Sequence, residues 1–135
     1  MSKLNATQSQ SNTNAGALFS RGLKAAKALL ERHGYTLLDT LSESSRSAIH
    51  FVAKDASDIV FVSVRVKSVS ADDCTMPCEN VNRSRFEQIA AKWIATSDKA
   101  ETGFSIRFDV LSVLICGDDK ALVRRHVNAF GAVED

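Results

Sequence analysis

The chain has 135 residues, of which 44% are hydrophobic and 24% are charged, so it is long enough for one hydrophobic core and has the composition of a globular protein. Its 17 basic and 16 acidic side chains give a net charge of +1, which excludes a global electrostatic argument for nucleic acid, membrane or acidic partners. No apolar run reaches the roughly 18 residues of a membrane span, and residues 1–10 contain no apolar signal segment. Three cysteines cannot all pair internally. We therefore expect a cytoplasmic protein with reduced cysteines and no membrane partner.

The first segments predict a tail followed by a helix. Residues 1–15 are mostly Ser, Asn, Gln and Thr, which bury too little surface to offset ordering entropy, so we expect a disordered tail there. Apolar residues then recur at helical spacing from Ala15 to His33, and Gly34 ends this helix. We expect one domain over residues 16–131 and a short tail at residues 132–135.

A β-hairpin is predicted from Ser47 to Lys67, after a short strand at Tyr35–Leu41. Two apolar arms flank a polar break at Lys54–Asp58, where turn-forming residues gather. The second arm alternates with period two, so its valines share one face. The other face begins apolar and ends with Ser63, Arg65 and Lys67. This polar end is typical either of a solvated sheet face or of the floor of a polar site.

The rest of the chain predicts one more helix and two more strands. Residues 68–80 are irregular, and Asn80 or Asn82 is placed to cap a helix over residues 81–97. Strands are expected at residues 104–116 and 121–130, joined by a turn at 117–120. The fold class is therefore α/β, with a mixed sheet of about five strands flanked by two main helices in the order α-β-β-β-α-β-β.

Six strings, in this order and spacing, resemble those of a known family. They are Gly22–Tyr35, Ile49–Ala53, Phe61–Val64, Ala91–Ile94, Arg107–Val110 and Asn128–Phe130. The family is the YraN-like proteins, a group of uncharacterised bacterial proteins with a restriction-endonuclease-like fold that is distantly similar to Holliday-junction resolvases. The resemblance covers residues 20–130 and implies a nuclease-like fold with DNA as its partner.

The nuclease-like residues of that family are replaced in this chain. The resemblance places a glutamate of the first helix at Leu23. It places Gly-Glu-Ile-Asp of the first hairpin arm at residues 47–50, so Ala48 and His50 replace the two acids. It places Glu-Val-Lys of the second arm at residues 63–65, so Ser63 and Arg65 replace the glutamate and the lysine.

These replacements remove the metal-binding chemistry that such a nuclease needs. Mg²⁺ and Mn²⁺ require converging carboxylate oxygens, which neutral Ser63 and apolar Leu23 do not supply. Arg65 keeps a positive charge, but its pKa is too high for proton transfer. We therefore expect a catalytically degenerate, nuclease-like protein without a cofactor, which binds DNA weakly through phosphate contacts. The residues expected to make those contacts are Arg65, Lys67, Arg83 and Arg85.

Two alternatives stay open. One is an active Mg²⁺- or Mn²⁺-dependent endonuclease with migrated residues, in which Lys67 joins carboxylates drawn from Asp39, Asp55, Asp58 and Glu87. The other is a protein-interaction module without nucleic acid, which an exposed apolar patch would indicate.

The remaining candidates favour structural roles. Cys74 and Cys78 have half the ligands of a zinc site, but only the scattered His33, His50 and His126 are available to complete it. His50 is interpreted as a core histidine, and Phe86 and Trp93 as core aromatic residues. Arg124 and Arg125 are interpreted as charges of an edge strand.

Overall fold

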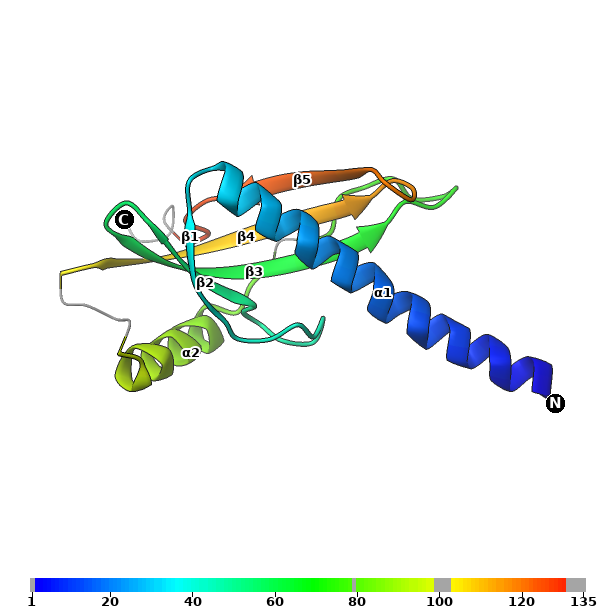
Figure 1. Cartoon of the computed structure of the whole chain (residues 1–135), viewed down its shortest axis with the longest axis horizontal. Helices are drawn as coiled ribbons and strands as arrows, with labels where there is room; N and C mark the ends of the chain where they lie inside the picture. The colour runs from blue at the N-terminus through cyan, green and yellow to red at the C-terminus, as the bar shows by residue number, and fades with distance from the viewer. Residues whose placement is uncertain (1, 79, 99–102, 131–135) are drawn as a thin grey trace.

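The computed structural model describes residues 2–78, 80–98 and 103–130, with backbone alone for residues 2–15. Seven elements follow one another in the order predicted from the sequence (Figure 1). They are α1 (Ser2–Arg32), β1 (Thr36–Thr40), β2 (Phe51–Asp55), β3 (Asp58–Ser68), α2 (Arg83–Thr96), β4 (Ser105–Ile115) and β5 (Ala121–His126).

The five strands form one mixed sheet in the order β1-β2-β3-β4-β5. β3 and β4 run parallel, and every other neighbouring pair is antiparallel. The connection between the parallel strands contains α2, as a crossover between parallel strands requires. The predicted α/β fold class, with its five-stranded mixed sheet and two helices, is confirmed.

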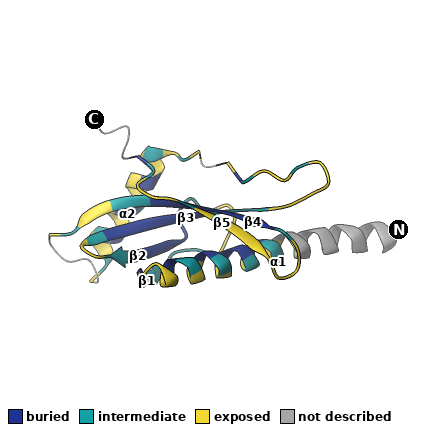
Figure 2. Cartoon of the chain, turned by 90° about the horizontal axis from the view of Figure 1, so that it is seen from above, coloured by how far each residue is buried: buried dark blue, intermediate teal, exposed yellow. Residues whose placement is uncertain are grey.

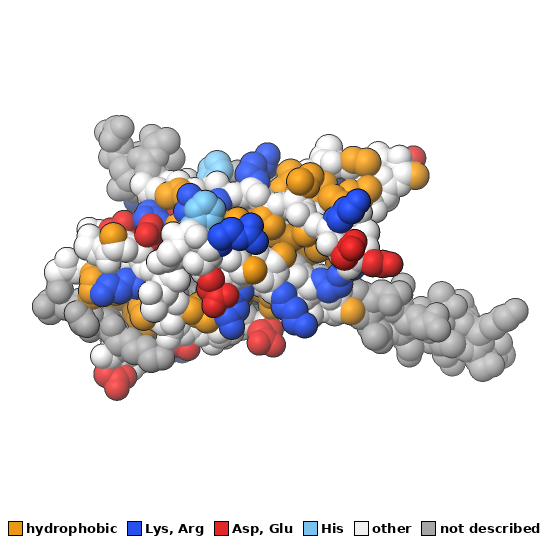
Figure 3. Space-filling view, turned by 45° about the horizontal axis from the view of Figure 1, so that its top comes forward, with side chains coloured by type: hydrophobic (Ala, Val, Ile, Leu, Met, Phe, Trp, Pro, Cys, Tyr) orange, Lys and Arg blue, Asp and Glu red, His pale blue; other side chains and the backbone are white. Residues whose placement is uncertain are grey.

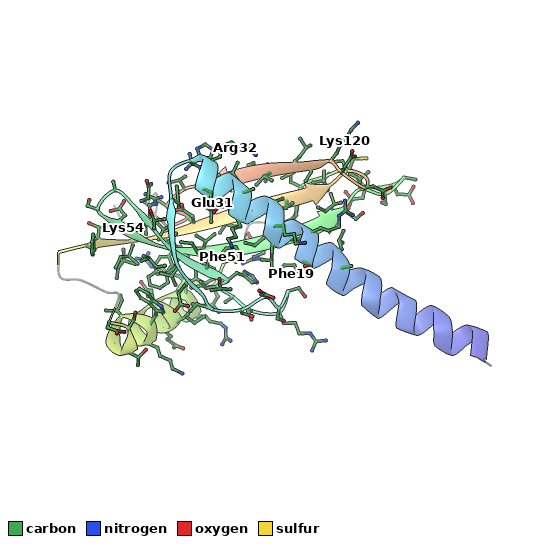
Figure 4. All side chains as sticks on the ribbon, in the orientation of Figure 1. Phe19, Glu31, Arg32, Phe51, Lys54 and Lys120 are labelled. Atoms are coloured by element: carbon green, nitrogen blue, oxygen red, sulfur yellow. The ribbon has the colours of Figure 1, made fainter. Side chains whose placement is uncertain are left out.

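Helix α1 covers one face of the sheet (Figure 2). Val60, Val62 and Val64 of β3 are buried beneath it, so the predicted valine face is confirmed. Phe19 of α1 and Phe51 of β2 belong to the same hydrophobic cluster (Figure 4). Gly34, with φ of 84°, ends the helix, because glycine adopts this backbone conformation without a Cβ penalty.

Helix α2 lies on the opposite face and closes a second hydrophobic cluster (Figure 2). The side chain of Asn82 accepts a hydrogen bond from the Arg85 backbone N–H, so Asn82 is the N-cap. Phe86 and Trp93 are buried against Ile59 and Phe61 of β3, which confirms their core role. The cluster covers only the first half of β3, and the polar residues of that strand lie beyond it.

Some boundaries differ from the expected ones. The hairpin turn is shorter than the predicted break and consists of Ala56 and Ser57, with Ala56 at φ of 55°. The last strand ends at His126 instead of residue 130. The backbone of α1 extends to Ser2, but the side chains of residues 2–15 lie outside the described part, so the tail at residues 1–15 and the bounds 16–131 and 132–135 stay predictions. No helix in the described ranges is long and apolar enough to cross a membrane.

Candidate functional site on the central strand

Strand β3 places Ser63, Arg65 and Lys67 on the face opposite α1, as its alternation predicts. Ser63 is fully buried, whereas Arg65 and Lys67 are half-buried. β3 is the central strand of the sheet, flanked by β2 and β4, so its backbone is held on both sides. Side chains on such a strand are rigidly positioned, which suits a binding site.

Arg65 lacks an acidic partner within the described chain. Its Nε donates a hydrogen bond of 3.1 Å to Ser63 Oγ, and no described carboxylate pairs with its guanidinium. Burial lowers the pKa of Arg65, and nearby Cys78 opposes this shift. A half-buried guanidinium without a counter-charge favours the approach of an anion.

His50 is a buried neutral histidine, which confirms its interpretation as a core residue. Its Nδ1 accepts a hydrogen bond of 3.0 Å from the Val64 backbone N–H. Its Nε2 therefore carries the proton and donates it to the Ser44 carbonyl at 2.8 Å. Burial lowers the pKa of His50, and the charge of Arg65 adds to this effect, while the Ser44 carbonyl opposes it. Because both ring nitrogens are engaged, the ring has no free lone pair for a metal.

The structure brings together only part of the set suggested by the resemblance. Ser63 and Arg65 are hydrogen-bonded, and the charge of Arg65 acts on His50. Leu23 is instead buried in the cluster beneath α1, on the other face from Ser63. Ala48 packs at the edge of the α2 cluster.

The four carboxylates of the active-nuclease alternative each have another partner. Asp39 accepts a hydrogen bond of 2.9 Å from Trp93 Nε1, and Glu87 pairs with Arg83 at 3.2 Å. Asp55 and Asp58 flank the hairpin turn and both bind Arg107 at 3.0 Å. In the described ranges, no group of three or more His, Cys, Asp or Glu residues could hold a metal ion.

The other predicted basic residues have different surroundings. Lys67 pairs with Asp73 at 2.5 Å and donates to Thr75 Oγ1 at 2.8 Å. The Lys67 hydrogen bond, aided by Thr75, lowers the pKa of Asp73. Arg83 lies over the Phe130 ring in addition to its pair with Glu87, whereas Arg85 is exposed and its guanidinium pairs with no described carboxylate.

Arg107 forms an ion network that the sequence reasoning missed. It binds the carboxylates of Asp55, Asp58 and Asp109, all at 3.0 Å, and donates to Tyr35 Oη at 2.6 Å. Burial lowers the pKa of Arg107, but hydrogen bonds to Asp109 and Asp55 and the charge of Asp109 outweigh it and raise that pKa. The spacing of Arg107 and Asp109 on one strand face was the available signal for this network.

Two further features bear on the alternatives. Cys74 and Cys78 are exposed free thiols, and Cys74 Sγ lies 3.5 Å from the Ser70 carbonyl oxygen.

A hollow of about 760 Å³ lies between α2 and β4, and the side chains that line it include Ala90, Ile94, Ile106 and Phe108. The protein-interaction alternative asks for an exposed apolar patch, and this mostly apolar hollow leaves that alternative a prediction.

Comparison with known proteins agrees with the resemblance. The family model of the uncharacterised protein family UPF0102 matches residues 23–113. A UPF0102 protein of Clostridium acetobutylicum is 34% identical over 96 residues, which cover 70% of this chain and 76% of the relative. UPF0102 proteins of Alkaliphilus metalliredigens and Moorella thermoacetica are 32% and 35% identical, over 67% and 68% of this chain and 79% and 76% of the relatives.

Proposed function

The chain belongs to UPF0102, a family of uncharacterised proteins, and from this premise we propose that it binds the phosphate backbone of nucleic acid without metal-dependent cleavage. The observation that supports the proposal is Arg65, a half-buried cation on the central strand with no described carboxylate partner. Phosphate oxygens suit a planar guanidinium, because two N–H groups reach two oxygens.

Arg85 provides a second contact of the same kind. It is exposed in the first turn of α2, where the backbone N–H groups of a helix also favour negative charge. Lys67 and Arg83 contribute less, because Asp73 and Glu87 already neutralise them. The expected four-residue set therefore divides into two principal and two secondary contacts.

The proposed absence of cleavage is supported by the shortage of metal-ligand atoms around Arg65. Ser63 offers one neutral oxygen, which already accepts from Arg65, and His50 offers no free nitrogen. A hard divalent cation in a nuclease needs carboxylates at this place. Leu23 and Ala48 carry no ligand atoms and pack in the two hydrophobic clusters.

Binding of labelled DNA by the pure protein, followed by fluorescence anisotropy at low salt, tests this proposal. We expect Arg65→Ala combined with Arg85→Ala to weaken binding about tenfold or more, because two charge-assisted contacts are lost. The matched control is Lys24→Ala combined with Arg32→Ala, which removes the same charge from exposed positions on α1. Equal loss in both double variants would contradict specific contacts.

Cleavage is tested on the same DNA, single-stranded and branched, with Mg²⁺ or Mn²⁺. We expect intact substrate after prolonged incubation. Cleavage that EDTA abolishes, and that persists across independent preparations, would favour the active-nuclease alternative.

A further inference from the structure

Ser112 is a buried serine without a hydrogen-bond partner. Its side chain has no exposed area, and its Oγ is the only buried side-chain polar atom in the described part of the chain with no hydrogen bond. Buried hydroxyls are nearly always satisfied, so an unpartnered one requires an explanation. A bound group that supplies an acceptor oxygen is one such explanation.

The sheet register places Ser112 beside Arg65. Ser112 is the Cα partner of Arg65 on β3 and of Arg124 on β5, so these three side chains form a row on one face of the sheet. Arg65 flanks the hydroxyl with a cation that no described carboxylate neutralises. Arg124 adds an exposed guanidinium on the other side. The row therefore joins one hydroxyl donor to two guanidinium groups.

We propose that this row is a binding site for a terminal phosphate group, in which Ser112 donates to one phosphate oxygen and Arg65 binds another. This inference rests on the proposed function and names the part of the nucleic acid that the site recognises. A terminal phosphate carries three free oxygens and two negative charges at neutral pH, whereas an internal phosphodiester has two free oxygens and one charge.

The burial of Ser112 favours a chain end over an internal phosphate. Its Oγ is buried and has no hydrogen-bond partner. A terminal phosphate is joined to the strand on one side only, so it needs less room at a buried hydroxyl than an internal phosphodiester, which is joined on both sides. Cys78 lies near Arg65, so the segment that contains it borders the site. The proposed complex requires that the Arg65 side chain exchange its hydrogen bond to Ser63 for one to the phosphate.

The variant Ser112→Ala suits the test, because removal of an unsatisfied buried hydroxyl leaves the fold intact or stabilises it. Ser105→Ala, at the exposed start of the same strand, is its matched control. Each protein is titrated with 5′-phosphorylated and 5′-hydroxyl forms of one DNA strand, and with inorganic phosphate followed by NMR.

We expect the native chain and Ser105→Ala to bind the 5′-phosphorylated strand about tenfold more tightly than the 5′-hydroxyl strand, the ratio expected for one charge-assisted contact. Ser112→Ala should reduce this preference to about twofold or less. Equal binding of both strands by the native chain would overturn the terminal-phosphate site and leave the proposed function standing. Binding of inorganic phosphate that depends on Ser112, with no binding of either strand, would overturn the proposed function and support the site. A phosphate preference that survives in Ser112→Ala would overturn the role of Ser112.

Discussion

Two arginines of the sheet have opposite surroundings. Arg107 lies among three carboxylates, and the pKa of its guanidinium is raised. Arg65 has a serine and a thiol nearby, and burial lowers the pKa of its guanidinium. The first arrangement pairs its charges within the protein, so removal of one partner would leave an uncompensated charge in the fold. The second leaves a positive charge without a described acid, and this contrast is the reason for proposing a phosphate contact at Arg65.

His50 predicts a pH dependence of stability. Because its pKa is lowered from 6.5, the unfolded chain takes up a proton at higher pH than the folded chain. Its contribution to stability is therefore present above pH 6.5 and is lost as the pH falls through the unfolded and then the folded pKa. Between these two pKa values, the free energy of unfolding falls by at most about 1.4 kcal/mol per pH unit.

Urea unfolding at pH 7.5 and pH 5 measures this effect. We expect the native chain to lose more stability between these values than His50→Gln, which cannot titrate. The exposed His33→Gln is the control, and it should follow the native chain. If His50→Gln loses as much stability as the native chain, His50 is not the group responsible.

The structural roles of several single residues could be predicted from the sequence, because each role depends on residues nearby in the chain. The asparagine cap at Asn82 and the glycine stop at Gly34 depend on neighbours within a few positions. The partners of Arg107 could not be predicted in this way, since Tyr35 is 72 positions and Asp55 52 positions away in the sequence. The lack of a hydrogen-bond partner for Ser112 Oγ likewise depends on the side chains that three strands place around it.

At the scale of elements, the close approach of α1 to β3 depends on Gly22. A Cβ at this position would lie 2.7 Å from Val66 Cγ1, which is closer than atoms pack. The resemblance includes this glycine in its helix pattern, and the structure provides a packing reason for it. Helical periodicity predicts that α1 buries one face, but it does not specify how near the helix comes to the sheet.

Gly22→Ala should destabilise the fold by about 1–3 kcal/mol, because the added methyl forces apart two packed elements. Gly16→Ala, on the same helix with open space around it, should be neutral or stabilising, since alanine is the better helix former. Val66→Ala should restore most of the stability to Gly22→Ala by removing the clashing methyls. The urea midpoints of the native chain, Gly22→Ala, Gly16→Ala and Gly22→Ala combined with Val66→Ala measure these stabilities. Equal effects of the substitutions at Gly16 and Gly22 would contradict the close contact between Gly22 and Val66.

The alternating face of β3 was predictable for a different reason. Period-two patterning depends only on strand geometry, so the sequence indicates which residues share a face. It does not indicate what covers that face. In the structure, α2 covers Ile59 and Phe61 but not Arg65, and this difference separates the core from the candidate site.

For the whole molecule, charge is nearly balanced, with 17 basic and 16 acidic side chains. Basic and acidic groups are interspersed on the surface seen in Figure 3. A chain of this kind has no broad positive field to attract nucleic acid, so any binding depends on a few contacts. Its affinity should therefore fall with salt less steeply than that of a strongly basic protein.

The slope of log affinity against log salt concentration provides the measurement. Each phosphate contact with duplex DNA contributes a slope of about −0.9, so two contacts through Arg65 and Arg85 predict about −1.8. Arg65→Ala should bring the slope to about −0.9. Lys67→Ala should leave it nearly unchanged, because Asp73 already neutralises that lysine. A slope near −3.6 that drops equally for both variants would show instead that all four basic residues release counterions, and that the ion pairs of Lys67 and Arg83 open when nucleic acid binds.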